Sequence, residues 1–146
     1  MRAILLVLSI VAVVSVGAFE AAIKSTTRLT ISAAGVDPNE IIDPGVLALS
    51  NVFAGTFIGE PADAPHPSLP RHTISFDIQT LDGIKTDAYL VHYCVDRATG
   101  QAFVYLPGWG EPSYRRNVST ILREGQDGRW HRASAKWSHA IQPYLR

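Results

Sequence analysis

The sequence predicts an α+β domain: an antiparallel β-meander sheet of about five strands with one or two helices, preceded by an N-terminal hydrophobic helix. Three strand patterns follow one another between residues 71 and 106, separated by the turn signals Asp82-Gly83 and DRATG. A helix-start signal, Asp43-Pro44, precedes them, and residues 3–19 carry no charge. At 146 residues, the chain is long enough for one hydrophobic core but not for a second.

The uncharged N-terminal stretch is long for a signal peptide and short for a membrane span. It covers seventeen residues, whereas a signal-peptide core has about 7 to 15 and a spanning helix at least about 17. Val16-Gly17-Ala18 offers a small-residue cleavage site, while residues 21–23 could lengthen a span. Residues 1–24 are therefore interpreted as a signal anchor or a signal peptide. An uncleaved segment would tether the protein to a membrane through residues 3–23, and cleavage would release a secreted domain.

Residues 25–146 are interpreted as a single exported domain, periplasmic or extracellular. Residues 26–32 alternate apolar and polar positions and predict a short strand or an extended tether, and residues 33–44 carry turn signals. From Asp43 as N-cap, a helix is expected to end near Gly55 and to be followed by a short strand, with a strand over residues 51–58 as the alternative. Four of the nine prolines fall in residues 59–70, which predicts a loop.

The central meander is the clearest pattern in the chain. If Asp82-Gly83 forms a two-residue turn, Leu81 lies opposite Ile84, and the strands pair Ile78 with Asp87, Phe76 with Tyr89 and Ile74 with Val91. The next loop would pair Val95 with Ala102 and Tyr93 with Val104. One face then carries the core residues Ile74, Phe76, Tyr89, Val91, Tyr93 and Val95. The opposite face carries Leu90, His92, Cys94, Phe103 and Tyr105, and it is apolar enough that a helix, a partner chain or a ligand is expected to cover it.

The C-terminal region predicts another hairpin. Residues 118–123 and 129–137 alternate around GQDG, although Trp130, Ala133, Trp137 and Ile141 are also spaced for a helix. We favour strand over helix for residues 129–137, with Ser138 capping at most one helical turn before Pro143.

This hairpin, STILREGQDGRWHRASAKWS, resembles the closing strands of NTF2-like (cystatin-like α+β) domains, in which a turn of the form Asp-Gly-Arg-Trp leads into the last strand. A membrane anchor ahead of such a domain is similar to envelope proteins of secretion assemblies. The resemblance implies a curved antiparallel sheet whose concave face binds a small ligand or another subunit. It implies no particular activity, because this fold hosts both enzymes and scaffolds.

The sequence contains no recognisable signature for a metal, a cofactor or a nucleophile. His92 and Cys94 point the same way, but neither Cys-x-x-Cys nor His-x-x-x-His spacing is present, and the lone Cys94 excludes a disulfide within the chain. His131 with Asp127 or Glu124 could form a proton-transfer pair, although such neighbours are ordinary in turns. Net charge is zero, which argues against nucleic acid. Seven of the thirteen Lys/Arg residues fall in residues 111–146, where they indicate a solvated surface or contact with lipid headgroups.

These patterns favour a non-catalytic module for binding or assembly in the cell envelope, with a protein partner or self-association and without a cofactor. The expected contact residues are those of the opposite face, Leu90, His92, Phe103 and Tyr105, or Trp109. Trp109 is included because it lies between two glycines in a loop. The alternative is a small NTF2-like enzyme or ligand-binding protein with a pocket near Tyr89, His92 and Tyr93.

Overall fold

The computed structural model of the chain describes residues 24–51, 56–80, 85–114 and 126–145. Its described elements, in chain order, are β1 (Lys24–Ala33), β2 (Val36–Ile41), α2 (Pro44–Leu49), β3 (Ile58–Pro61), β4 (Arg71–Thr80), β5 (Lys85–Asp96), β6 (Gln101–Leu106), β7 (Arg129–Ala133), α4 (Ala135–Ile141) and a 3-10 turn (Gln142–Tyr144). The strands form one sheet of seven, in the order β2-β1-β4-β5-β6-β7-β3. All pairs are antiparallel, so the α+β class is confirmed, while the expected number of strands was too low.

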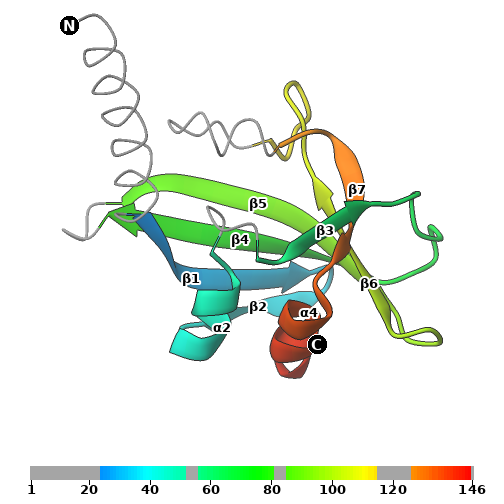
Figure 1. Cartoon of the computed structure of the whole chain (residues 1–146), viewed down its shortest axis with the longest axis horizontal. Coiled ribbons are helices and arrows are strands. Elements are labelled where there is room, and N and C mark those ends of the chain that lie inside the picture. The colour runs from blue at the N-terminus through cyan, green and yellow to red at the C-terminus, as the bar shows by residue number, and fades with distance from the viewer. Residues whose placement is uncertain (1–23, 52–55, 81–84, 115–125, 146) are drawn as a thin grey trace, which may run out of the picture.

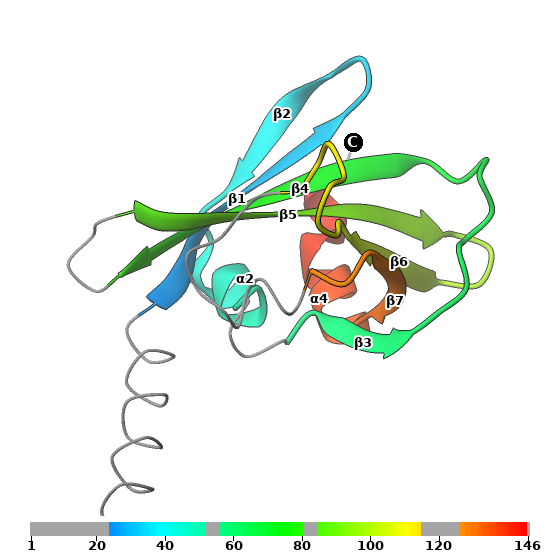
Figure 2. The same cartoon turned by 90° about the horizontal axis from the view of Figure 1, so that it is seen from above.

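The sheet curls around the two short helices. Figures 1 and 2 show α2 and α4 on the same side of β4 and β5, with β3 on the far side of α4. The concave face therefore holds the core, and residues 107–114 lie on the opposite side of the sheet from the helices (Figure 1). This arrangement gives the domain two chemically distinct surfaces, a helix-covered inner face and a loop-covered outer face.

The predicted register of the meander is confirmed. Phe76 pairs with Tyr89, Ile74 with Val91, and Tyr93 with Val104. The predicted core face is buried, with Val95 only partly so. Beyond Ile78 the pairing shifts by one residue, so that Gln79 lies opposite Lys85. The turn at Asp82-Gly83 and the pair of Leu81 with Ile84 lie outside the described residues.

The N-terminal part of the domain contains a strand, β2, where the sequence predicted turns. β1 includes the predicted strand at residues 26–32, but β2 occupies residues expected to form turns. Among the described strands, β2 is an edge strand whose one neighbour is β1. An edge strand tolerates Pro38 because one side of the strand needs no ladder partner. Gly35, with φ of +74°, makes the turn between the two strands.

The predicted helix start is confirmed, but the helix is short. The Asp43 carboxylate accepts a hydrogen bond from the Val46 amide at 3.0 Å, and Pro44 occupies the first turn. α2 ends at Leu49 rather than near Gly55, and residues 52–55 are outside the description. The first residues of the predicted proline-rich loop belong instead to β3, which is the other edge of the sheet and ends at Pro61.

The preference for a strand over residues 129–137 was half wrong. β7 ends at Ala133, and α4 begins at Ala135 with Ser134, not Ser138, as its N-cap. The strand ends here because Trp137 and Ile141, spaced four residues apart, are both buried as one face of a helix. The expected strand at residues 118–123 lies outside the described part of the chain.

The core is an aromatic cluster between the helices and the sheet. The Trp137 ring lies 5.2 Å from Phe57, 6.4 Å from Phe76 and 5.6 Å from Tyr93, measured between ring centroids. The Trp137 indole donates to the buried Ser50 hydroxyl at 2.8 Å, and that hydroxyl donates to the Val46 carbonyl at 2.7 Å. Thr26 donates to the Ser50 carbonyl at 2.8 Å. One serine thus joins α4, α2 and β1.

The structure contains no membrane-spanning helix within residues 24–51, 56–80, 85–114 and 126–145. The predicted anchor or signal segment, residues 1–24, lies almost entirely outside these ranges.

Candidate functional site

The residues predicted to contact a partner lie on or beside the outer face of the sheet. His92, Phe103 and Tyr105 are half-buried, whereas Leu90 is buried. Residues 107–114, which we call the outer loop, lie over part of this face, for which a helix, a partner chain or a ligand was expected as a cover. The loop bonds to both Tyr105 and His92. Trp109 projects from this loop with 77% of its surface exposed. The outer loop therefore covers part of the outer face, and the exposed Trp109 side chain lies on this loop.

Glu111 holds the outer loop on the sheet. Its carboxylate accepts a hydrogen bond from the Tyr105 hydroxyl at 2.7 Å and another from the Gly108 amide at 2.5 Å. The bond from Tyr105, followed by that from Gly108, lowers the pKa of Glu111, while the same carboxylate raises the pKa of Tyr105 to about 12. Gly108 lies against the backbone of Gly128, where an added Cβ would come within 3.1 Å. The loop is fixed by both bonding and close packing.

His92 makes the second attachment of the loop. Its Nε2 lies 2.8 Å from the Ser113 hydroxyl, and its Nδ1 lies 3.4 Å from the Thr73 hydroxyl. Burial, and then the positive charge of Arg71, lowers the pKa of His92, so the ring is neutral at pH 7. A neutral histidine beside a serine hydroxyl is also the geometry of a base and a nucleophile.

Three amides of the outer loop already have hydrogen-bond acceptors. The amides of Gly108, Glu111 and Tyr114 are all bonded within the loop. Those three amides are therefore not free to stabilise an oxyanion. We therefore interpret the bond between His92 and Ser113 as one that holds the outer loop on β5, just as the bond between Tyr105 and Glu111 holds it on β6.

Aromatic rings continue the outer face across β6 and β7. Tyr105 stacks on His92 at 6.1 Å and lies 5.3 Å from Trp130, between ring centroids. The Arg71 guanidinium sits 5.0 Å from the Trp130 ring centroid, within the range of a cation–π contact. Trp109 itself contacts Tyr114 edge to face at 5.6 Å. This contact supports the Trp109 ring on one side and leaves the rest of it open to solvent.

The alternative pocket near Tyr89, His92 and Tyr93 is not one cavity. Tyr89 is buried in the aromatic core, where burial raises the pKa of its hydroxyl. His92 and Tyr93 are adjacent in β5 and point to opposite faces of the sheet, because side chains alternate along a strand. Tyr93 borders a hollow on the inner side.

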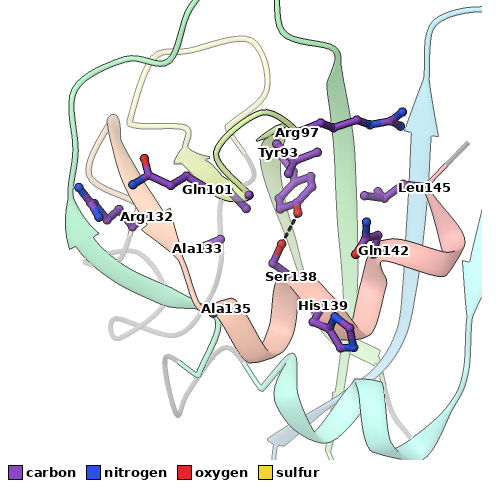
Figure 3. A pocket seen from close by; sticks show the side chains of 13 residues that line it. Tyr93, Arg97, Gln101, Arg132, Ala133, Ala135, Ser138, His139, Gln142 and Leu145 are labelled. Carbon is purple, nitrogen blue, oxygen red and sulfur yellow. Dashed lines mark hydrogen bonds between the residues drawn. The ribbon is translucent and has the colours of Figure 1, made fainter.

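That hollow is a groove of about 760 Å³ between the end of the β5–β6 hairpin, β7 and α4. Figure 3 shows the Tyr93 hydroxyl at the inner wall, sharing a hydrogen bond of 2.5 Å with the Ser138 hydroxyl. Ala133 and Ala135 lie on one side, and Gln142 and Leu145 lie on the other (Figure 3). The groove is open because small side chains line it where β6, β7 and α4 meet.

No family model, curated protein or solved structure matches this chain. The NTF2-like resemblance stays a prediction.

The predicted contact between His131 and Asp127 forms, but its geometry is structural. The His131 Nε2 lies 2.8 Å from the Asp127 carboxylate, and its Nδ1 lies 3.2 Å from the Gly59 carbonyl. The ring thereby fastens β3 to β7 and is buried in doing so. Glu124, the other predicted partner, is outside the described residues. Within the described ranges no three His, Cys, Asp or Glu residues are grouped as metal ligands.

Sequence reasoning missed Glu111 and Ser113, which organise the outer loop, and Ser138 in the groove. Glu111 follows the Gly-Trp-Gly motif directly, and an acidic side chain beside two glycines can bond to the amides of its own turn. That local signal could have identified Glu111. Nothing local in the sequence indicates the bonds from Ser113 to His92 or from Ser138 to Tyr93, because both join residues that are distant in the chain.

Proposed function

We propose that this protein is an exported, membrane-tethered binding module, non-catalytic, that presents Trp109 on the outer loop to a protein partner. The observation that carries the proposal is the contrast within the loop between a fixed base and an exposed tip. Residues 108, 111 and 113 are bonded or packed on the domain, while Trp109 is 77% exposed. The hydrophobic segment at residues 3–23 supports the tether.

A fixed loop favours binding because little conformational entropy is lost when the partner docks. Tryptophan is among the residues that most often dominate the free energy of protein–protein contacts, since one ring buries a large area and can also donate a hydrogen bond. The outer face behind the loop adds Trp130 and Arg71, a second aromatic and cationic pair. Such residues are enriched at interfaces, so the contact could extend from Trp109 along this face.

Replacing Trp109 by alanine tests the proposal in the full chain. After mild detergent extraction from native membranes, we expect the wild-type chain to run above its monomer mass of 15.9 kDa, and Trp109→Ala to lose the partner. Ile42→Ala is the matched control, because Ile42 is 72% exposed but lies between β2 and α2, away from the loop. A wild-type chain recovered alone as a monomer, or an equal effect of both substitutions, would contradict the proposal.

A further inference from the structure

The groove beside α4 has a composition suited to a ligand with an anionic head and an apolar tail. Its apolar lining comes from small or aliphatic side chains: Val95, Ala102, Ala133, Ala135 and Leu145. Its polar lining includes Arg97, Arg132 and His139, and no carboxylate is among the lining residues described. The volume of about 760 Å³ lies within the range of about 300 to 1,000 Å³ that is usual for small-ligand sites.

Arg97 and Arg132 form no ion pair within the described residues. The ion pairs of the described residues lie elsewhere: they join Arg28 to Glu40 and Asp77, and His131 to Asp127. The nearest acid in sequence, Asp96, accepts a hydrogen bond from the Ala98 amide at 2.9 Å and so completes the hairpin turn. Figure 3 shows the Arg132 side chain turned away from Ala133, so Arg97 is the guanidinium that an anion in the groove would meet.

The inner wall also retains a free donor. Tyr93 and Ser138 each have one hydroxyl proton, and the bond between them uses only one of the two. The other proton can be donated to a ligand oxygen. Tyr93 is held in place by its edge-to-face contact with the buried Trp137 ring, so this donor is fixed by the core.

We propose that the groove formed by the β5–β6 hairpin, β7 and α4 is a binding site for a small organic carboxylate with an aliphatic tail. The tail lies along the alanines of β6, β7 and α4, and the carboxylate lies toward Arg97 and the hydroxyl pair. This site borders α4, on the other side of the sheet from the outer loop (Figure 1), and Trp109 is not among its lining residues.

Octanoate is a suitable probe, because it is soluble as a monomer and carries both features. Saturation-transfer NMR on the full chain, with the same detergent without protein as the blank, is expected to show octanoate binding. Octan-1-ol, which has the same tail without the charge, is expected to bind at least about tenfold more weakly. Equal binding of the alcohol and the acid, or no transfer to octanoate, would overturn the proposal.

Two variants place the binding in the groove. Ala135 is exposed at the start of α4, so Ala135→Leu fills the hollow without removing a core contact and is expected to abolish octanoate binding. Arg97→Gln is expected to weaken binding about tenfold. Arg129→Gln is the control, since Arg129 is exposed on β7 outside the groove, and it should bind as the wild type does. Circular dichroism confirms folding. Wild-type binding by folded Ala135→Leu and Arg97→Gln would refute the site.

Discussion

At the scale of single residues, one carboxylate makes two of the hydrogen bonds that hold the outer loop in place. Glu111→Gln removes the charge that holds the Tyr105 hydroxyl and the Gly108 amide. We expect the substitution to lower the free energy of unfolding at pH 7 by roughly 0.5–1.5 kcal/mol, the usual net value of a hydrogen bond, because water screens this partly exposed site. Chemical denaturation measures the loss. Glu60→Gln, on the exposed edge strand β3, is the matched control and should have little effect.

The pH dependence of that stability has a defined sign. The folded-state pKa of Glu111 is lowered from its ordinary value of 4.5, so the charged form stabilises the fold above pH 4.5. This contribution is lost as the pH falls through the lowered pKa. Wild type and Glu111→Gln should therefore converge in stability below pH 4.5, and curves that stay parallel would show that Glu111 is not coupled to folding.

The sequence could predict the faces of individual strand residues but not their polar partners. Ile74, Phe76 and Ile78 alternate with polar residues, and a pattern with a period of two assigns each residue to one face. His92 was correctly assigned to the outer face. Its partner Ser113 could not be predicted, because the bond depends on how the outer loop folds back over β5.

At the scale of elements, the two short helices are joined by the buried bond from the Trp137 indole to the Ser50 hydroxyl. Ser50→Ala leaves the indole donor unsatisfied in the core and should cost about 1–3 kcal/mol. In a Trp137→Phe background, which has no indole donor, Ser50→Ala should cost less stability than it does in the wild type. The difference is the coupling energy between the two residues, expected at about 0.5–1.5 kcal/mol. Thr56→Ala is the control, since this exposed hydroxyl also donates to a carbonyl, that of Leu49. Additive costs at residues 50 and 137 would contradict the coupling.

Tertiary context explains the elements that the sequence alone did not predict. β2 contains Asp37-Pro38, which is a turn signal in isolation, but an edge strand accepts proline. Residues 129–141 carry both a period of two and a period of 3.6, and the structure uses each in turn. The switch at Ser134 follows from the burial of Trp137 between α2 and the sheet, a contact between distant segments.

At the scale of the whole molecule, the curled sheet separates the two proposed binding surfaces. The helices lie on the concave side, where the groove borders α4, while the outer loop lies on the convex side (Figure 1). Ligand binding in the groove should therefore leave the Trp109 contact intact unless the sheet itself changes its curvature. Chain length predicts a single core, and the NTF2-like resemblance implies a curved sheet. The pairing of β7 with β3 around α4 joins distant segments, so no local pattern could predict it.

The central claim is that a membrane-bound chain contacts a partner through Trp109. A photo-crosslinking amino acid placed at position 109 in intact cells, with the same amino acid at position 42 as the control, tests this claim directly. We predict one discrete adduct from position 109, recovered in the membrane pellet after an alkaline wash, and none from position 42. Equal adducts from both positions, or a chain recovered in the soluble fraction without an adduct, would contradict the account.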